Sequence, residues 1–234
     1  MQRRPMSEGD IESSLREIRS LRRQGLITAK EAYERHVALL SGAPEAPPAA
    51  DAPRAAGDSL AALDLLAVAV ALFGGALGIV GAFFQELQSG GFGILLAFAG
   101  APIIEEALKP GGVYFLLARW PSFLEERGRV YTAGLAATAG LTFGLIESLV
   151  YVTLYFPEGG AGFVLFRFTV PVLMHGVASF LVGLGLSRQV IDWAAGRSPL
   201  PRATRNFYIA GVLLHAAYNV TVVVLSVAGV VDLD

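Results

Sequence analysis

The stretch from Leu65 to Phe84 contains twenty consecutive residues without a charged side chain. A helix of this length crosses a hydrocarbon core of about 30 Å. Further apolar runs follow at residues 91–119, 130–156, 163–186 and 207–231. Because 54% of the residues are hydrophobic and only 16% are charged, the chain is too apolar for a water-soluble domain. We therefore predict an all-α, polytopic helical membrane protein with about five transmembrane helices.

Arginines on the loops between these runs indicate the orientation of the chain. They lie between the second and third runs, and between the fourth and fifth: Arg119, Arg127, Arg129, Arg188, Arg197, Arg202 and Arg205. The other loops have none, so the N-terminus and both basic loops are predicted to be cytoplasmic, in the cell membrane. The polar N-terminus does not resemble a signal peptide, so the first span is expected to act as the membrane signal. Arg167, inside the fourth run, is expected to snorkel to the outer headgroups.

Residues 1–42 are predicted to form a small helical hairpin ahead of the membrane part. Gly25 can end its first helix, and Thr28 with Glu31 can start the second as a capping box. The segment resembles the SHOCT module. Because residues 11–41 cannot bury a core of their own, they are expected to bind a partner or a second copy of the chain. The hairpin's arginines are expected to form a solvated face, with no nucleic-acid partner.

The rest of the chain divides into two parts. Residues 43–60 form an Ala/Pro-rich linker, and residues 61–234 form the transmembrane domain. Within this domain, ionisable residues lie roughly 14 to 24 Å below the predicted outer surface on four different spans, where each is costly unless it is paired or hydrated. These residues and their polar companions are Glu105, Glu106, Lys109, Glu147, His175, Ser179, His215 and Asn219.

Their spacing along the chain is regular. Four pairs lie four residues apart, namely Glu105 and Lys109, Phe143 and Glu147, His175 and Ser179, and His215 and Asn219. Each pair projects from one face of its helix, so four helices are predicted to share one pocket. Pro110 and Pro171 remove backbone donors beside it, and interrupted helices at this depth are tolerated where they line a wet cavity.

Several of these residues also have a structural interpretation. Glu105 and Lys109 could form only a neutralising pair, and a single buried histidine is often a contact between helices. Ser179 is expected to lie at a contact between helices, since a small hydroxyl satisfies its own backbone, and Phe143 is expected to pack. Close helix contacts are expected at two glycine pairs, Gly74 with Gly78 and Gly140 with Gly144. Coincidence does not explain three glutamates, a lysine and two histidines at one depth.

In chain order, the motifs EEALK (105–109), FGLIE (143–147), HGVAS (175–179) and HAAYN (215–219) resemble the four motifs of the PrsW family of intramembrane proteases. A more distant likeness is to the type II CAAX prenyl endopeptidases and bacteriocin-processing enzymes. In those enzymes the basic residue comes one position later than Lys109, and a histidine replaces Glu147. PrsW relatives commonly have more than five spans. The resemblance implies hydrolysis of peptide bonds in membrane-spanning substrates such as an anti-sigma factor.

Amide hydrolysis requires an activated water, a proton donor and stabilisation of an oxyanion. Two neighbouring carboxylates in a medium of low dielectric constant do not ionise together easily. Glu105 and Glu106 are therefore expected to share protons, with Lys109 keeping one of them charged. This arrangement supplies a base and an acid.

The remaining polar residues are assigned supporting roles or a metal. Glu147 or His175 is expected to assist the glutamate that activates water, while His215 and Asn219 hold the oxyanion. Alternatively, Glu147, His175 and His215 bind one zinc ion and leave a position for water. No HExxH helix is present and these ligands come from separate spans, so the sequence favours a metal-free glutamate enzyme.

Two classes of non-enzyme remain open. Buried carboxylates and histidines also serve as proton or cation relays in transporters, although these residues cluster at one depth and the runs show no inverted repeat. The chain could also be a catalytically inactive membrane scaffold whose N-terminal hairpin recruits partners.

Overall fold

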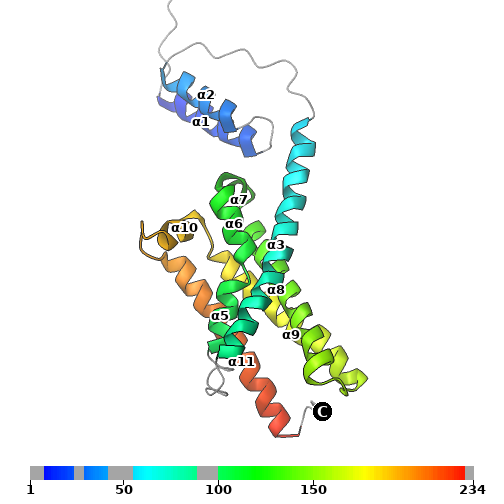
Figure 1. Ribbon diagram of the computed structural model, residues 1–234. Helices are drawn as coiled ribbons and strands as arrows, with labels where there is room; N and C mark the ends of the chain where they lie inside the picture. The colour runs from blue at the N-terminus through cyan, green and yellow to red at the C-terminus, as the bar shows by residue number, and fades with distance from the viewer. Residues whose placement is uncertain (1–7, 24–28, 42–54, 89–99, 230–234) are drawn as a thin grey trace, which may run out of the picture. The chain divides into compact units, whose positions relative to one another are not determined.

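The computed structural model of the chain describes residues 8–23, 29–41, 55–88 and 100–229 (Figure 1). The elements that these residues form are all helices, which confirms the predicted all-α fold. The chain separates into two compact units, Met1–Asp64 and Leu65–Asp234.

The first unit contains the helical hairpin expected from the sequence. Two helices pack against each other, α1 (Glu8–Arg23) and α2 (Ala29–Ser41). Tyr33 and Val37 of α2 are 71% and 44% exposed, so part of the apolar periodicity of this helix is not buried within the hairpin. The predicted turn at Gly25 and the capping residue Thr28 lie outside the described residues. The SHOCT resemblance and the partner stay predictions.

Among the described residues, four helices are long and apolar enough to cross a membrane, and they coincide with the first, third, fourth and fifth predicted runs. They are residues 61–82 of α3 (Ala55–Gln88), α8 (Arg129–Val150) with the short π-helix η2 (Tyr151–Tyr155), α9 (Ala161–Leu184) and α11 (Arg202–Val227). The protein is therefore a multi-pass membrane protein. α3 begins within the predicted linker, whose residues 43–54 lie outside the description.

The second predicted run takes a different form. Residues 89–99 are outside the described part, and the remainder forms two short helices, α5 (Ala101–Leu108) and α6 (Gly111–Arg119). The interruption falls at Lys109 and Pro110, because proline has no backbone N–H and crowds the preceding turn. Pro171, in contrast, lies inside α9 without ending it.

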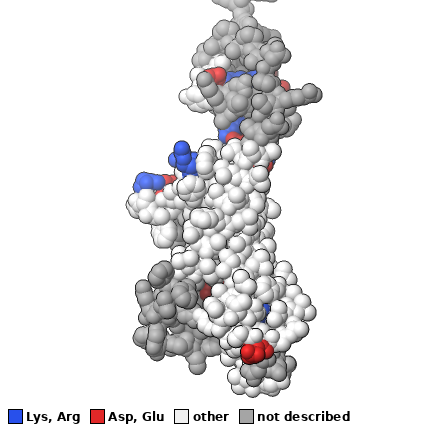
Figure 2. All heavy atoms as spheres, turned by 45° about the vertical axis from the view of Figure 1, so that its right-hand side comes forward, with Lys and Arg blue, Asp and Glu red and all other residues white. Residues whose placement is uncertain are grey.

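Short helices complete the loops that carry the arginines. These are α7 (Pro121–Arg127) and α10 (Arg188–Ala194). Apolar side chains of these short helices pack into one core with side chains of α3, α6, α8 and α9. The members of this core include Ala67, Val113, Leu124, Leu135, Val182 and Val190. In Figure 2 the described surface of the second unit carries few charged side chains between its ends. Large apolar side chains such as Leu165, Leu173 and Leu213 are exposed there, as expected for a surface in contact with lipid.

Glycines allow the helices around the site to approach closely. A Cβ atom at Gly74 of α3 would lie 2.3 Å from the backbone nitrogen of Gly112 in α6. One at Gly140 of α8 would lie 2.4 Å from the carbonyl oxygen of His175, and one at Gly144 would lie 2.9 Å from the His175 ring. These distances confirm the predicted close contacts at Gly74, Gly140 and Gly144.

We predict that Gly140→Ala lowers the free energy of unfolding by about 1–3 kcal/mol, because its new methyl group must displace the backbone of α9. Gly134→Ala is the matched control on α8, since a Cβ there meets nothing within 4 Å. It is expected to be neutral or slightly stabilising. Unfolding of both variants in detergent measures the difference, and equal stability of the two would contradict the close contact of α8 and α9.

Candidate active site

The EEALK segment places three charged side chains in the protein interior. Glu106 and Lys109 are fully buried, and Glu105 is 7% exposed. The Lys109 ammonium lies 2.6 Å from Glu106 Oε1 and 3.2 Å from Glu105 Oε2. The predicted pair of Glu105 and Lys109 is therefore present, but the shorter contact is with Glu106. One ammonium faces two carboxylates.

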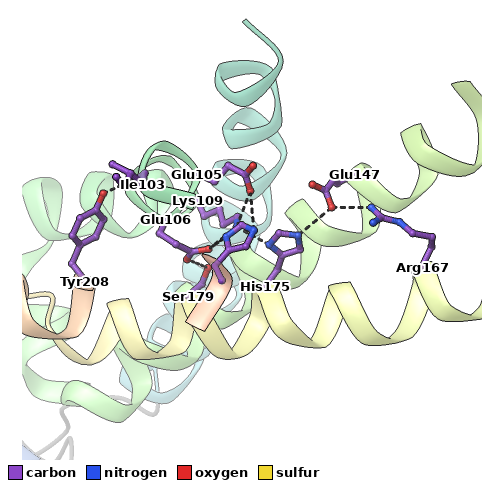
Figure 3. Close-up of polar contacts among 10 residues, drawn as sticks. Ile103, Glu105, Glu106, Lys109, Glu147, Arg167, His175, Ser179 and Tyr208 are labelled. Carbon is purple, nitrogen blue, oxygen red and sulfur yellow. Dashed lines mark hydrogen bonds and ion pairs between the residues drawn. The ribbon is translucent and has the colours of Figure 1, made fainter. Parts of the chain in front are cut away.

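Both buried histidines face this group of charges, His215 from α11 and His175 from α9, and Figure 3 labels His175 beside Lys109. Nδ1 of His175 lies 2.7 Å from Lys109 Nζ, and Nδ1 of His215 lies 3.0 Å from Glu106 Oε1. The two imidazole rings meet edge to face, with their centroids 4.8 Å apart. The structure thus confirms the predicted meeting of the EEALK charges with the two imidazoles.

Two residues support this cluster by direct contact. Ser179 lies at a contact between helices, as predicted, but its hydroxyl donates to Glu106 Oε2 at 3.2 Å and not to its own backbone, since α9 faces α5 at this point. Phe143 packs as predicted: it is fully buried, its ring lies against His175, and Lys109 Nζ lies 4.4 Å from the ring centroid. Glu106 therefore has contacts from three helices, and Lys109 has an apolar cover.

Glu147 joins the cluster from α8 on the far side of His175. Its Oε2 lies 3.1 Å from His175 Nε2 and 3.0 Å from Arg167 Nη2 (Figure 3). Arg167 is only 9% exposed. The expectation that it snorkels to the headgroups is wrong, because the Glu147 carboxylate offers a buried ion pair. The position of Arg167 in an apolar run, two helical turns before His175, was the sequence signal for an ion pair near the site.

Asn219 lies one turn beyond His215 on α11 and is partly buried. Its place on the same face of the helix agrees with the predicted spacing. Its assignment to the oxyanion stays a prediction.

The partners of the two imidazoles define where their protons lie. Lysine only donates hydrogen bonds, so Nδ1 of His175 accepts from Lys109, and Nε2–H donates to Glu147. In His215, Nδ1 donates to the Glu106 carboxylate, which leaves Nε2 as an acceptor. Each imidazole is thus oriented by one carboxylate, as in histidines that ligate metals.

Three side chains of the cluster fit a divalent cation once the Lys109 ammonium leaves Nδ1 of His175, which it contacts at 2.7 Å. Among the described residues, ligand atoms of Glu105, His175 and His215 lie within 4.8 Å of one another. Oε2 of Glu105 is buried without a hydrogen-bond partner, and it lies 3.9 Å from His215 Nε2. The predicted zinc set had Glu147 in place of Glu105. In the structure Glu147 instead contacts the outer nitrogen of His175.

A set of carboxylates and imidazoles held together by helices of spanning length is the arrangement expected of an intramembrane hydrolytic enzyme. The comparisons with known proteins agree with this class. A model of the PrsW family intramembrane metalloproteases matches residues 59–232, and the chain belongs to that family of proteases. No curated protein and no solved structure matches the chain.

We predict that Lys109→Met lowers the free energy of unfolding by about 3–5 kcal/mol, because it leaves buried carboxylates without their cation. Adding Glu106→Gln should recover part of this loss, since it removes one of the two charges. Unfolding of both variants in detergent tests the coupling. Wild-type stability of Lys109→Met alone would show that the carboxylates do not depend on this ammonium.

Proposed function

We propose that the protease hydrolyses peptide bonds of membrane-spanning protein substrates, of the anti-sigma-factor type, at the cluster on α5, α8, α9 and α11. The observation that supports this site best is the buried Oε2 of Glu105, which faces two imidazoles and whose contact is the ion pair with Lys109 at 3.2 Å, without a hydrogen bond. An oxygen of this kind can accept a proton from water or bind a metal.

The family's description as metalloproteases and the geometry of Glu105 favour the zinc alternative over the metal-free enzyme. Glu105, His175 and His215 are the residues that would hold the ion. When bound, such an ion polarises the scissile carbonyl and makes water a stronger nucleophile. Within the described part of the chain, the three carboxylates pair with the cations Lys109 and Arg167, which gives one excess negative charge when all three are ionised and both imidazoles are neutral.

The protein side chains position the reaction and move the protons. Glu106 holds the His215 ring through Nδ1, and Glu147 holds the His175 ring through Nε2. Lys109 donates to Glu106 across 2.6 Å, and this contact forms a route for the proton removed from water. We assign Asn219 to the developing oxyanion, and Lys109 to proton donation to the leaving nitrogen.

We also propose the orientation predicted from the arginines. The loops that contain α7 and α10 carry the basic residues, and so the N-terminal hairpin lies in the cytoplasm of a cell whose plasma membrane holds the enzyme. The substrate and the lipid bilayer are its expected partners, and residues 11–41 are the segment we assign to a further partner or a second copy.

We predict that Glu105→Gln and Glu106→Gln each reduce cleavage of a single-span substrate by about 10²–10⁴-fold while the protein stays folded. Glu125→Gln, which changes an exposed glutamate of α7, is the control and should cleave at the wild-type rate. Gel-based cleavage assays in detergent measure the rates. Full activity of Glu105→Gln would contradict the proposed site.

Removal of metal is expected to abolish cleavage, because Glu105 and both imidazoles lose the ion that they hold. Zinc added back after dialysis should restore the rate, and the purified protein should bind about one zinc per chain. Metal analysis and cleavage assays before and after chelation test this. A metal-free protein with full activity would contradict the zinc mechanism and favour the metal-free glutamate enzyme.

A further inference from the structure

Arg167 lies outside the four motifs and has no role in the reaction described so far, yet it is buried beside the site. Its guanidinium touches Glu147 Oε2 at 3.0 Å, and the same oxygen lies 3.1 Å from His175 Nε2. One carboxylate oxygen therefore joins the arginine to the imidazole. The chain of contacts runs from Arg167 to Glu147 and then to His175, as Figure 3 shows.

The backbone beside Arg167 is fixed by a second contact between the same two helices. Pro171 has no N–H, so the Arg167 carbonyl lacks its donor one turn later in α9. The hydroxyl of Ser148, which follows Glu147 directly, donates to this carbonyl at 2.5 Å and is fully buried. The turn of α9 that precedes Pro171 is thereby bonded to the residue next to Glu147.

An aromatic ring fixes the side chain of Arg167. Its guanidinium carbon lies 3.8 Å from the centroid of the Tyr151 ring. Tyr151 comes one turn after Glu147, at the start of the π-helix η2, so both side chains project from the same side of the α8 end. A guanidinium on an aromatic face is held by a cation–π contact that strengthens when water is excluded.

We propose that Arg167 and Tyr151 are positioning residues that hold Glu147, and through it His175, in the orientation that the reaction requires. This inference rests on the proposed function, because in that proposal the oriented His175 is a ligand of the zinc ion. Arg167 does not touch the Lys109 side of the ring. It acts only on the carboxylate that accepts from Nε2–H, and this bond directs Nδ1 toward Glu105 and Lys109.

The contact of Arg167 with Glu147 uses a single nitrogen, and Arg167 Nε is buried without a hydrogen-bond partner. A lysine can supply one N–H contact to the carboxylate, although it loses the flat stacking on the ring. Arg167→Lys is therefore the conservative variant, and Arg167→Met removes the charge while keeping the apolar stem. Tyr151→Leu removes the aromatic face, whereas Tyr151→Phe keeps it.

The test measures zinc binding to the full-length apoprotein in detergent, together with the NMR chemical shift of the His175 Nε2–H proton, which reports its hydrogen bond to Glu147. The tautomer itself stays Nε2–H, because Nδ1 accepts from Lys109. Arg167→Met should weaken zinc binding about 10- to 100-fold and shift the Nε2–H resonance upfield, because Glu147 is no longer held against the ring. Arg167→Lys should recover most of the zinc affinity and of the NMR signal of His175. Tyr151→Leu should change these two quantities in the same direction as Arg167→Met, and Tyr151→Phe should match wild type. Arg197→Met, which breaks the exposed pair with Asp192, is the control for loss of an arginine.

The inference is overturned if folded Arg167→Met has wild-type zinc affinity and the wild-type Nε2–H chemical shift, because the ion pair then only stabilises the fold. If Arg167→Met does not fold, Tyr151→Leu and Tyr151→Phe are compared instead, and equal behaviour of these two variants contradicts the proposal. A wild-type protein that neither binds zinc nor cleaves would contradict the proposed function instead. The comparison of Nε2–H shifts would still decide whether Arg167 orients His175.

Discussion

A buried ammonium between two carboxylates is the constraint on which the rest of the membrane unit depends. Lys109 has no exposed surface, so its charge is stable only while Glu105 and Glu106 remain beside it. Glu106 in turn needs the donors that α9 and α11 bring, Ser179 and His215. A shift of any of these helices leaves a charge without a partner in a medium of low dielectric constant. The same contacts that assemble the site therefore also fix the packing of α5, α9 and α11.

Departures from regular helix packing are concentrated around this cluster. Pro110 ends the EEALK helix directly after Lys109, and Pro171 frees a carbonyl that Ser148 then satisfies. Gly140 and Gly144 remove side chains where the His175 turn of α9 meets α8. Each departure lets a polar group approach another helix more closely than regular, side-chain-covered helices would allow. The polar contacts and the close helix packing thus depend on the same few residues.

Much of this arrangement could be predicted from the sequence, because apolar runs define the spans and residue spacing defines one face of each helix. The meeting of the EEALK charges with both imidazoles followed from these two facts. Three features did not follow: the inward direction of Arg167, the bond from Ser179 to Glu106, and the grouping of Glu105, in place of Glu147, with the imidazoles. They depend on the rotation and tilt of one helix against another, which spacing within a helix does not define.

X-ray absorption spectroscopy of the zinc-loaded protein tests the central claim most directly, because it reports the atoms around the ion. We predict two imidazole nitrogens at about 2.0–2.1 Å and carboxylate or water oxygens at about 2.0–2.2 Å, with one imidazole lost in His175→Ala and in His215→Ala. An ion without imidazole ligands, or an unchanged spectrum in both variants, would contradict a site built by Glu105 and the two buried histidines.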